Sequence, residues 1–160
     1  MNIAVIIAGG CGHRMKNEIP KQFLNVNDKP VVVYTLEAFQ EHPGIDEIGV
    51  VCIDGWETIL SAYAKQYKIT KLRWVVPGGD CGQASIRHGV EEAEKHYSPD
   101  DILLIHDAIR PNVSADIISD CIAQCQAHGS AVSVVPCNTA VLLKSGPESS
   151  EKIVDRDTLA

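Results

Sequence analysis

The stretch 8–22 carries the kinds of groups that hold a phosphate-rich ligand. Its glycines are Gly9, Gly10 and Gly12, and the cations Arg14 and Lys21 follow just behind them. Closely spaced glycines let the backbone turn sharply and approach a ligand. Free N–H groups in such a turn, with cations beside them, suit an anion. The pattern predicts a phosphate-binding loop, and the alternative is a glycine-rich turn with solvated cations.

This stretch differs from the two most familiar phosphate loops. The dinucleotide fingerprint G-x-G-x-x-G requires a glycine at the position where this chain has Met15. The Walker loop requires Gly-Lys followed by Ser or Thr, and the sequence contains no such triplet. The phosphate chemistry, if present, therefore belongs to another class of loop.

Composition limits the kind of protein. The 160 residues are 45% hydrophobic and 22% charged, which is ordinary for one globular domain. The formal net charge of −7 argues against general binding of nucleic acids, which need a basic surface. No apolar run reaches the length of a membrane span, and no basic leader precedes the first apolar run. We expect no nucleic-acid partner and no membrane partner.

The six cysteines form no Cys-x-x-Cys pair, and most lie within apolar runs. Reduced core residues explain them better than a disulfide scaffold or a zinc site. Cys121 and Cys125 stand one helical turn apart, and we interpret them as small core residues. This usage favours a cytoplasmic protein.

Apolar runs alternate with helical periodicity along most of the chain. We expect five buried strands, at 3–7, 48–53, 72–76, 102–105 and 132–135. We expect helices at 30–40, at 56–67, after Asp80 as far as Ala93, and from a cap at Ser114 to Gly129. The inward face of the last helix should carry Ile117, Ile118, Cys121, Ile122 and Cys125.

This alternation predicts an α/β fold, with a doubly wound, mostly parallel sheet covered by helices on both faces. Ligands of such sheets bind beyond the carboxyl ends of the strands. The glycine loop, Gly78-Gly79-Asp80 and His106-Asp107 each follow a strand, so we expect them to converge. The rhythm changes afterwards: 140–144 and 152–154 read as a β-hairpin arm within residues 137–157.

Several of these residues together resemble a known family. The first stretch matches A-[AG]-G-x-G-x-R-M followed by P-K-Q, and 106–111 reads H-D-A-I-R-P. Gly-Gly-Asp at 78–80, Ser85 and Val-Asp-Arg at 154–156 extend the likeness over the whole chain. The sequence is similar to the cytidylyltransferases that act on methylerythritol phosphate or ribitol phosphate. The resemblance implies a Rossmann-like nucleotidyltransferase domain over 1–160 that continues beyond residue 160.

The resemblance also implies roles for individual residues. The catalytic pair would be Arg14 and Lys21, and Asp107 would hold Mg²⁺. The nucleotide would contact Ala8, Gly9, Gly10, Gly12, Gly79, Asp80 and Ser85. The second substrate would contact Arg110, Thr139 and Arg156. Arg110 could instead pair with Asp107, and His106 should serve support or packing. Gly82 departs from the family, which usually has an arginine there.

The implied reaction is transfer of CMP from CTP to a small polyol phosphate with release of pyrophosphate. Gly9 and Ile109 lean toward D-ribitol 5-phosphate, with 2-C-methyl-D-erythritol 4-phosphate close behind. The family implies a homodimer through the arm, with Arg156 serving a neighbour's site. The alternatives are a transferase for another nucleotide or sugar phosphate, and a non-catalytic nucleotide-binding domain.

Overall fold

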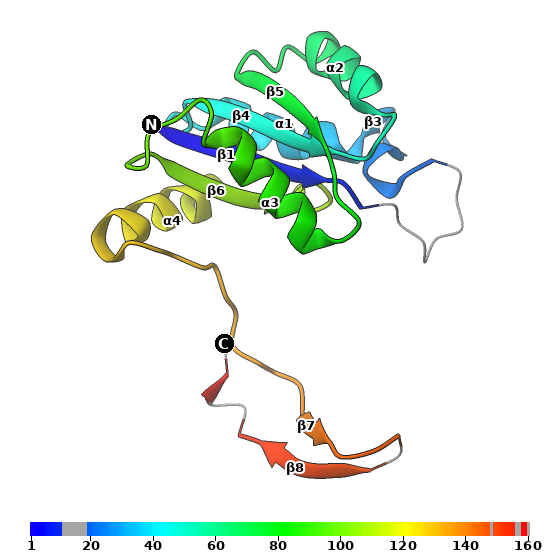
Figure 1. The fold of residues 1–160 in the computed structure, drawn as a ribbon, viewed down its shortest axis with the longest axis vertical. Coiled ribbons are helices and arrows are strands. Elements are labelled where there is room, and N and C mark those ends of the chain that lie inside the picture. Colours follow the sequence, from blue (N-terminus) through cyan, green and yellow to red (C-terminus); the bar gives the residue numbers. More distant parts are fainter. Residues whose placement is uncertain (11–18, 148, 156–157, 160) are drawn as a thin grey trace.

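The computed structural model describes residues 1–10, 19–147, 149–155 and 158–159. Its centre is a parallel sheet of four strands, drawn in Figure 1: β1 (Asn2–Ala8), β4 (Glu47–Cys52), β5 (Leu72–Pro77) and β6 (Ile102–Asp107). The strand order is β5-β4-β1-β6, so β1 lies inside the sheet. Four of the five expected strands are therefore confirmed.

Helices cover both faces of the sheet, as the alternation of elements predicts. They are α1 (Val31–Glu41), α2 (Glu57–Gln66), α3 (Gly82–Ala93) and α4 (Ala115–His128). Successive β1 residues alternate between two cores: Ala4 and Ile6 join the core under α1, α2 and α4, whereas Ile3 and Val5 join Ala93 of α3. Figure 1 shows α3 alone across its face of the sheet.

The expected fifth strand at 132–135 is not formed. These residues lie outside every strand, and Val132 and Val135 are 81% and 77% exposed. A strand needs a hydrogen-bonded neighbour, and within the described residues β6 pairs with β1 only. The apolar run is real, but it lacks the partner that would make it a strand.

A short hairpin precedes α1 and was not expected from the sequence. The 3₁₀ turn η2 (Lys21–Phe23) leads into β2 (Asn25–Val26) and β3 (Lys29–Pro30), which pair antiparallel. Asn27 and Asp28 join the two strands with positive φ angles of 50° and 61°. Asn-Asp is a turn pair that tolerates this conformation, so the signal was present in the sequence.

Helix α4 begins and ends as predicted. The Oγ atom of Ser114 accepts from the N–H of Ile117 at 3.3 Å, and Gly129 ends the helix at φ +85°. The expected inward face is wrong at one position: Ile117 is 43% exposed, whereas Ile118 and Ile122 are buried. The contact with the sheet therefore uses a narrower stripe than the apolar residues suggest.

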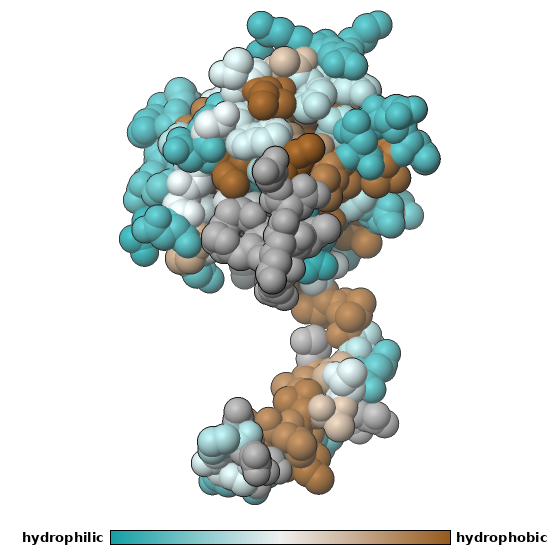
Figure 2. Space-filling model, turned by 90° about the vertical axis from the view of Figure 1, so that its right-hand side faces the viewer, coloured by the Kyte–Doolittle hydropathy of each residue, from teal (hydrophilic) through white to brown (hydrophobic). Residues whose placement is uncertain are grey.

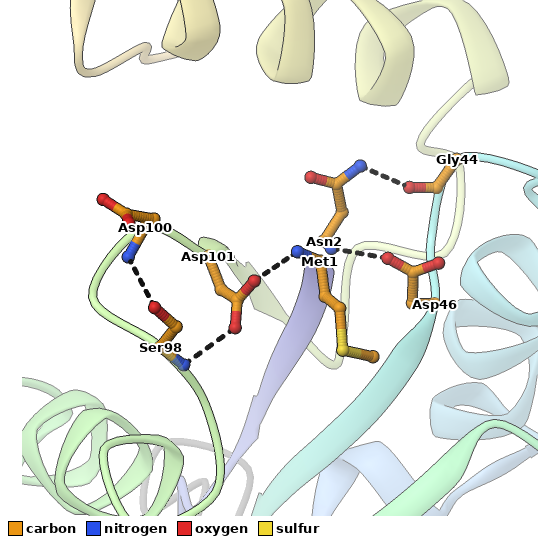
Figure 3. Close-up of polar contacts among 7 residues, drawn as sticks. All are labelled: Met1, Asn2, Gly44, Asp46, Ser98, Asp100 and Asp101. Atoms are coloured by element: carbon orange, nitrogen blue, oxygen red, sulfur yellow. Dashed lines mark hydrogen bonds and ion pairs between the residues drawn. The ribbon is translucent and has the colours of Figure 1, made fainter.

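A polar cluster fixes the amino-terminal edge of the sheet (Figure 3). The amino group of Met1 pairs with Asp101, and the other Asp101 oxygen accepts from the N–H of Ser98 at 2.8 Å. Asn2 donates from its backbone N–H to Asp46 at 2.7 Å. These bonds tie β1 to the segments that enter β4 and β6, at the edge opposite to the expected site.

The predicted arm is confirmed as a hairpin of β7 (Val141–Lys144) and β8 (Ser150–Val154). Figure 1 shows it extending away from the α/β domain. Leu142 faces Ile153 across the pair, and these side chains are 54% and 72% exposed. Figure 2 shows the resulting apolar surface over the arm and its connecting segment.

The described cysteines are free, and Cys52 is buried while Cys81 is exposed. Cys121 and Cys125 are half-buried on α4, which only partly meets the expectation of core residues. In the portion of the chain that the structure describes, no helix is both long and apolar enough to cross a membrane.

Candidate nucleotide-binding site

The predicted loops meet at the carboxyl edge of the sheet. Ile7 of β1 lies opposite Asp107 of β6, so the glycine loop begins beside the end of β6. On the other side, the N–H of Gly78 donates to the carbonyl of Cys52 at 2.6 Å. The topology therefore brings three distant segments of sequence to one edge.

Gly9 and Gly78 pack backbone against backbone. A Cβ atom added to Gly9 would lie 3.2 Å from Cα of Gly78 and 2.9 Å from Oγ of Ser85. A Cβ atom added to Gly78 would lie 3.0 Å from Cα of Gly9. Such distances are tighter than a side chain normally allows, so both positions require glycine or a local shift. The convergence of the first two loops is confirmed.

Ser85 holds the second loop. Its side chain is 2% exposed, and its Oγ atom accepts from the N–H of Gly79 at 3.1 Å. A Cβ atom on Gly79 would come within 2.5 Å of the Cβ atom of Ala84, so this turn also lies close to its helix. Asp80, next to it, is exposed. The buried hydroxyl fixes the loop that would face a nucleotide.

Asp107 and Arg110 form an ion pair at the end of β6. The Nε atom of Arg110 lies 2.8 Å from Oδ2 of Asp107, and the side chains are 73% and 52% exposed. Of the two alternatives for Arg110, the structure shows the pair. A pair this exposed contributes only about 0–1 kcal/mol, so a ligand can readily open it.

Asp107 is suited to a hard cation such as Mg²⁺. It is a carboxylate at a strand end beside the glycine loop. No group of three His, Cys, Asp or Glu residues that could hold a metal occurs among the described residues. Protein-bound Mg²⁺ commonly uses one or two carboxylates together with substrate phosphates. The donor set therefore fits a metal that arrives with a triphosphate.

Two side chains hold the loop that carries Asp107. The ring of His106 lies 5.1 Å from that of Phe39, and its Nε2 atom lies 2.9 Å from the carbonyl of Arg110. The support expected of His106 is confirmed. Thr35, fully buried on α1, donates from Oγ1 to the carbonyl of Ala108 at 2.8 Å. Sequence reasoning missed Thr35, because an apolar helix face conceals one hydroxyl.

Lys21 lies in the 3₁₀ turn η2, and its neighbour Gln22 reaches the glycine loop. The Nε2 atom of Gln22 donates to the carbonyls of Ala8 and Gly10, at 2.6 Å and 3.1 Å. The P-K-Q motif includes Gln22, but the sequence assigned no role to this residue. Its contacts place Lys21 next to the base of the loop.

Four predicted site residues remain: Gly12, Arg14, Thr139 and Arg156. Arg14, Gly12 and Arg156 lie outside the described residues. Thr139 is exposed in the segment before β7, and Figure 1 shows this segment leading away from the α/β domain to the arm. Gly82 begins α3, and a Cβ atom there would meet nothing within 4 Å.

Burial raises the pKa of the Cys52 thiol to about 12. Cys52 ends β4, close to Gly78, but its thiol stays protonated near neutral pH. Cys52 is therefore not a nucleophile at this edge of the sheet. The site offers backbone N–H groups, a carboxylate and cations, which suit the positioning of phosphates rather than covalent catalysis.

The fold and this edge of the sheet define the class of the protein: a parallel α/β domain with glycine-rich loops where nucleotides bind. The sequence pattern of IspD, described as 2-C-methyl-D-erythritol 4-phosphate cytidylyltransferase, matches residues 2–160. The chain belongs to the IspD family.

Curated relatives fall into two groups by name. A "Ribitol-5-phosphate cytidylyltransferase" of Lacticaseibacillus paracasei is 43% identical over 159 residues, covering 99% of this chain and 68% of the relative. A "2-C-methyl-D-erythritol 4-phosphate cytidylyltransferase" of Clostridium botulinum is 36% identical over 159 residues, covering 99% of this chain and 68% of the relative. This chain thus spans about two thirds of the length of such relatives.

A solved structure agrees with this assignment. The 2-C-methyl-D-erythritol 4-phosphate cytidylyltransferase of Francisella tularensis is 27% identical, with a TM-score of 0.74. The match covers 98% of this chain and 67% of that one. The predicted family and fold class are confirmed.

Proposed function

We propose that this chain is the nucleotide-binding part of a CTP-dependent cytidylyltransferase that transfers CMP to a small polyol phosphate. One observation carries the proposal. The backbones of Gly9 and Gly78 touch, and the register places Asp107 of β6 beside the start of the same loop. A triphosphate at this edge would meet N–H groups on one side and a carboxylate for its metal on the other.

The reaction needs no protein nucleophile. A phosphate oxygen of the polyol phosphate attacks the α-phosphorus of CTP, and the bond from that phosphorus to the bridging oxygen of pyrophosphate breaks. Lys21 and Arg14 stabilise the negative charge that builds up during the exchange. Mg²⁺, held by Asp107, would supply further charge neutralisation. The loops carrying Gly79, Asp80 and Ser85 hold the nucleotide.

D-ribitol 5-phosphate is the polyol phosphate that we favour. The relative at 43% identity carries that substrate in its name, as do further relatives at 40%. Gly9 and Ile109 point the same way by resemblance. Relatives named for 2-C-methyl-D-erythritol 4-phosphate are 36–38% identical, which makes it the second candidate.

The test is pyrophosphate release from CTP with each polyol phosphate in turn. We expect release with D-ribitol 5-phosphate to exceed release with 2-C-methyl-D-erythritol 4-phosphate. The reverse order would assign the other substrate. Tight CTP binding without pyrophosphate from any polyol phosphate would support the alternative of a non-catalytic nucleotide-binding domain and overturn the proposal.

We further propose that the arm joins two copies in a cytoplasmic homodimer, in which Thr139 and Arg156 serve the partner's site. Leu142, Leu143 and Ile153 are each at least half exposed on a hairpin that reaches away from its own domain. Sedimentation should give twice the chain mass, and Leu142→Glu with Ile153→Glu should give a monomer. A wild-type monomer at micromolar concentration would contradict this assembly.

A further inference from the structure

Gln22 is a buried side chain whose amide group spans the start of the glycine loop. It is 1% exposed, and its Nε2 atom donates both hydrogens to backbone carbonyls, those of Ala8 and Gly10. Its Oε1 atom is buried without a hydrogen-bond partner among the described residues. Rotating the amide by half a turn would set Oε1 against two carbonyl oxygens, so the acceptors themselves fix its orientation.

These two bonds join segments that are separate in sequence. Gln22 is 14 residues from Ala8 and 12 from Gly10, and it belongs to η2, the turn that also carries Lys21. The bonds therefore close the glycine-rich segment at its base. Without them, the position of Lys21 relative to Ala8 and Gly10 would lack these two direct links between the segments.

The same bonds orient the first peptide of the loop. The carbonyl of Ala8 accepts from Gln22 and also from the N–H of Ile53, on the side of β4. A trans peptide directs its N–H opposite to its C=O. The N–H of Gly9 therefore points toward the side of β6, where Asp107 ends the strand.

We propose that Gln22 is a positioning residue for nucleotidyl transfer, an inference that rests on the proposed function. Its amide holds the Gly9 N–H and the Lys21 turn in one fixed arrangement, so that both can act on the same phosphate. The role is preorganisation: the side chain touches no substrate, but it sets where the donors lie before the nucleotide arrives.

Gln22→Met tests this role, because methionine keeps the length and burial of the side chain but donates no hydrogen bond. Gln40→Met is the matched control. Gln40, on α1, also uses its amide, donating to Thr70 at 3.1 Å and accepting from the N–H of Lys71 at 2.8 Å. Those contacts involve none of the predicted site residues.

The first readout is amide hydrogen exchange, which needs no activity. Two backbone amides report on the two sites. The N–H of Phe23 donates to the carbonyl of Pro20 at 2.8 Å in η2, and the N–H of Ile48 donates to the carbonyl of Lys71 at 2.8 Å. Gln22→Met should speed exchange at Phe23 on the order of tenfold and leave Ile48 unchanged. Gln40→Met should speed exchange at Ile48 and leave exchange at Phe23 unchanged. Unchanged exchange at Phe23 in folded Gln22→Met would overturn the proposal.

The second readout is kinetic, at a temperature where both variants are fully folded. Gln22→Met should lower kcat about tenfold and change the KM for CTP less than about threefold, since misplaced groups slow the chemical step. A purely structural role would leave both constants unchanged once the protein is folded. An inactive wild type would instead refute the proposed function, and the exchange experiment would still test Gln22.

Gln22→Glu separates hydrogen-bond donation from packing. Glutamate has nearly the shape of glutamine, but its carboxylate only accepts and would face two carbonyl oxygens. This variant should be less active than Gln22→Met at pH 8. It should recover relative to wild type as the pH falls, because a protonated carboxyl donates one bond. Wild-type activity of Gln22→Glu at every pH would mean that shape alone matters and would overturn the proposal.

Discussion

Asp107→Asn should separate metal binding from folding. The substitution keeps the shape of the side chain and removes the charge that a hard cation prefers. It also releases Arg110, whose Nε atom lies 2.8 Å from Oδ2 of Asp107. We expect a weaker response to Mg²⁺ in a protein that remains folded.

The structure sets the size of both effects. The two side chains are 52% and 73% exposed, so losing their pair should cost at most about 1 kcal/mol of unfolding free energy. Substituting residues that merely support metal ligands already weakens binding by roughly 10–100-fold. Loss of the ligand itself should therefore raise the Mg²⁺ midpoint at least about tenfold. The unpaired guanidinium of Arg110 would add to this effect.

Asp101→Asn is the matched control, because it changes the net charge equally just before the other end of β6. The amino group of Met1 and the N–H of Ser98 hold the pKa of Asp101 below its usual range. Because the pKa of Asp101 is lower in the folded state, its ionised carboxylate stabilises the fold at pH values above the unfolded-state pKa of about 4. This stabilisation is lost as the pH falls through the folded-state pKa.

The assay is a Mg²⁺ titration of CTP turnover, with thermal unfolding of each variant at pH 7 and pH 3. Asp107→Asn should shift the Mg²⁺ midpoint with little change in Tm. Asp101→Asn should lower Tm at pH 7 and should lower it less at pH 3. It should leave the Mg²⁺ midpoint unchanged. An unchanged midpoint in Asp107→Asn would make that carboxylate structural and refute the reasoning.

Three other substitutions address single contacts. Lys21→Ala should reduce turnover on the order of a hundredfold, equivalent to ~3 kcal/mol, with little change in the calorimetric Kd for CTP; near-normal turnover would contradict its role. Thr35→Val is isosteric and leaves the buried carbonyl of Ala108 without its donor at 2.8 Å, so denaturant unfolding should show a loss of about 1–3 kcal/mol. A smaller loss would mean that water replaces the hydroxyl. Gly82→Arg has room for its side chain, and arginine favours a helix over glycine by up to about 1 kcal/mol. It should raise Tm and tighten CTP binding beside Asp80, whereas an unchanged Kd would show that the loop does not face the nucleotide.

Much of the architecture could be predicted because local patterns agree with the fold. The buried runs of β1 and β4, the Ser114 cap and the Gly129 stop are each specified by a few adjacent residues. The residues at the strand ends could be found because a parallel sheet gathers them at one edge. Gln22 and Thr35 could not be assigned a role this way, because their hydrogen bonds span 14 and 73 residues.

The run 132–135 failed as a strand for a different physical reason. Its composition is right, but strands exist only in pairs, and their N–H and C=O groups need a neighbour. Beside it, a groove of about 1550 Å³ follows β6 and α4, where Ile105 is 41% exposed. About a third of the length of these curated relatives lies outside the matched part, and we propose that this third covers the groove.

Joining the unmatched part of such a relative to this chain should therefore raise Tm and suppress the binding of a hydrophobic dye. It should also slow amide exchange at Val132 and Val134, which are now 81% and 57% exposed. A control join with a flexible Gly-Ser segment of equal length should change none of these. If the two joined proteins behaved alike, the exposed valines would belong to an interface between chains rather than to a missing neighbour within one.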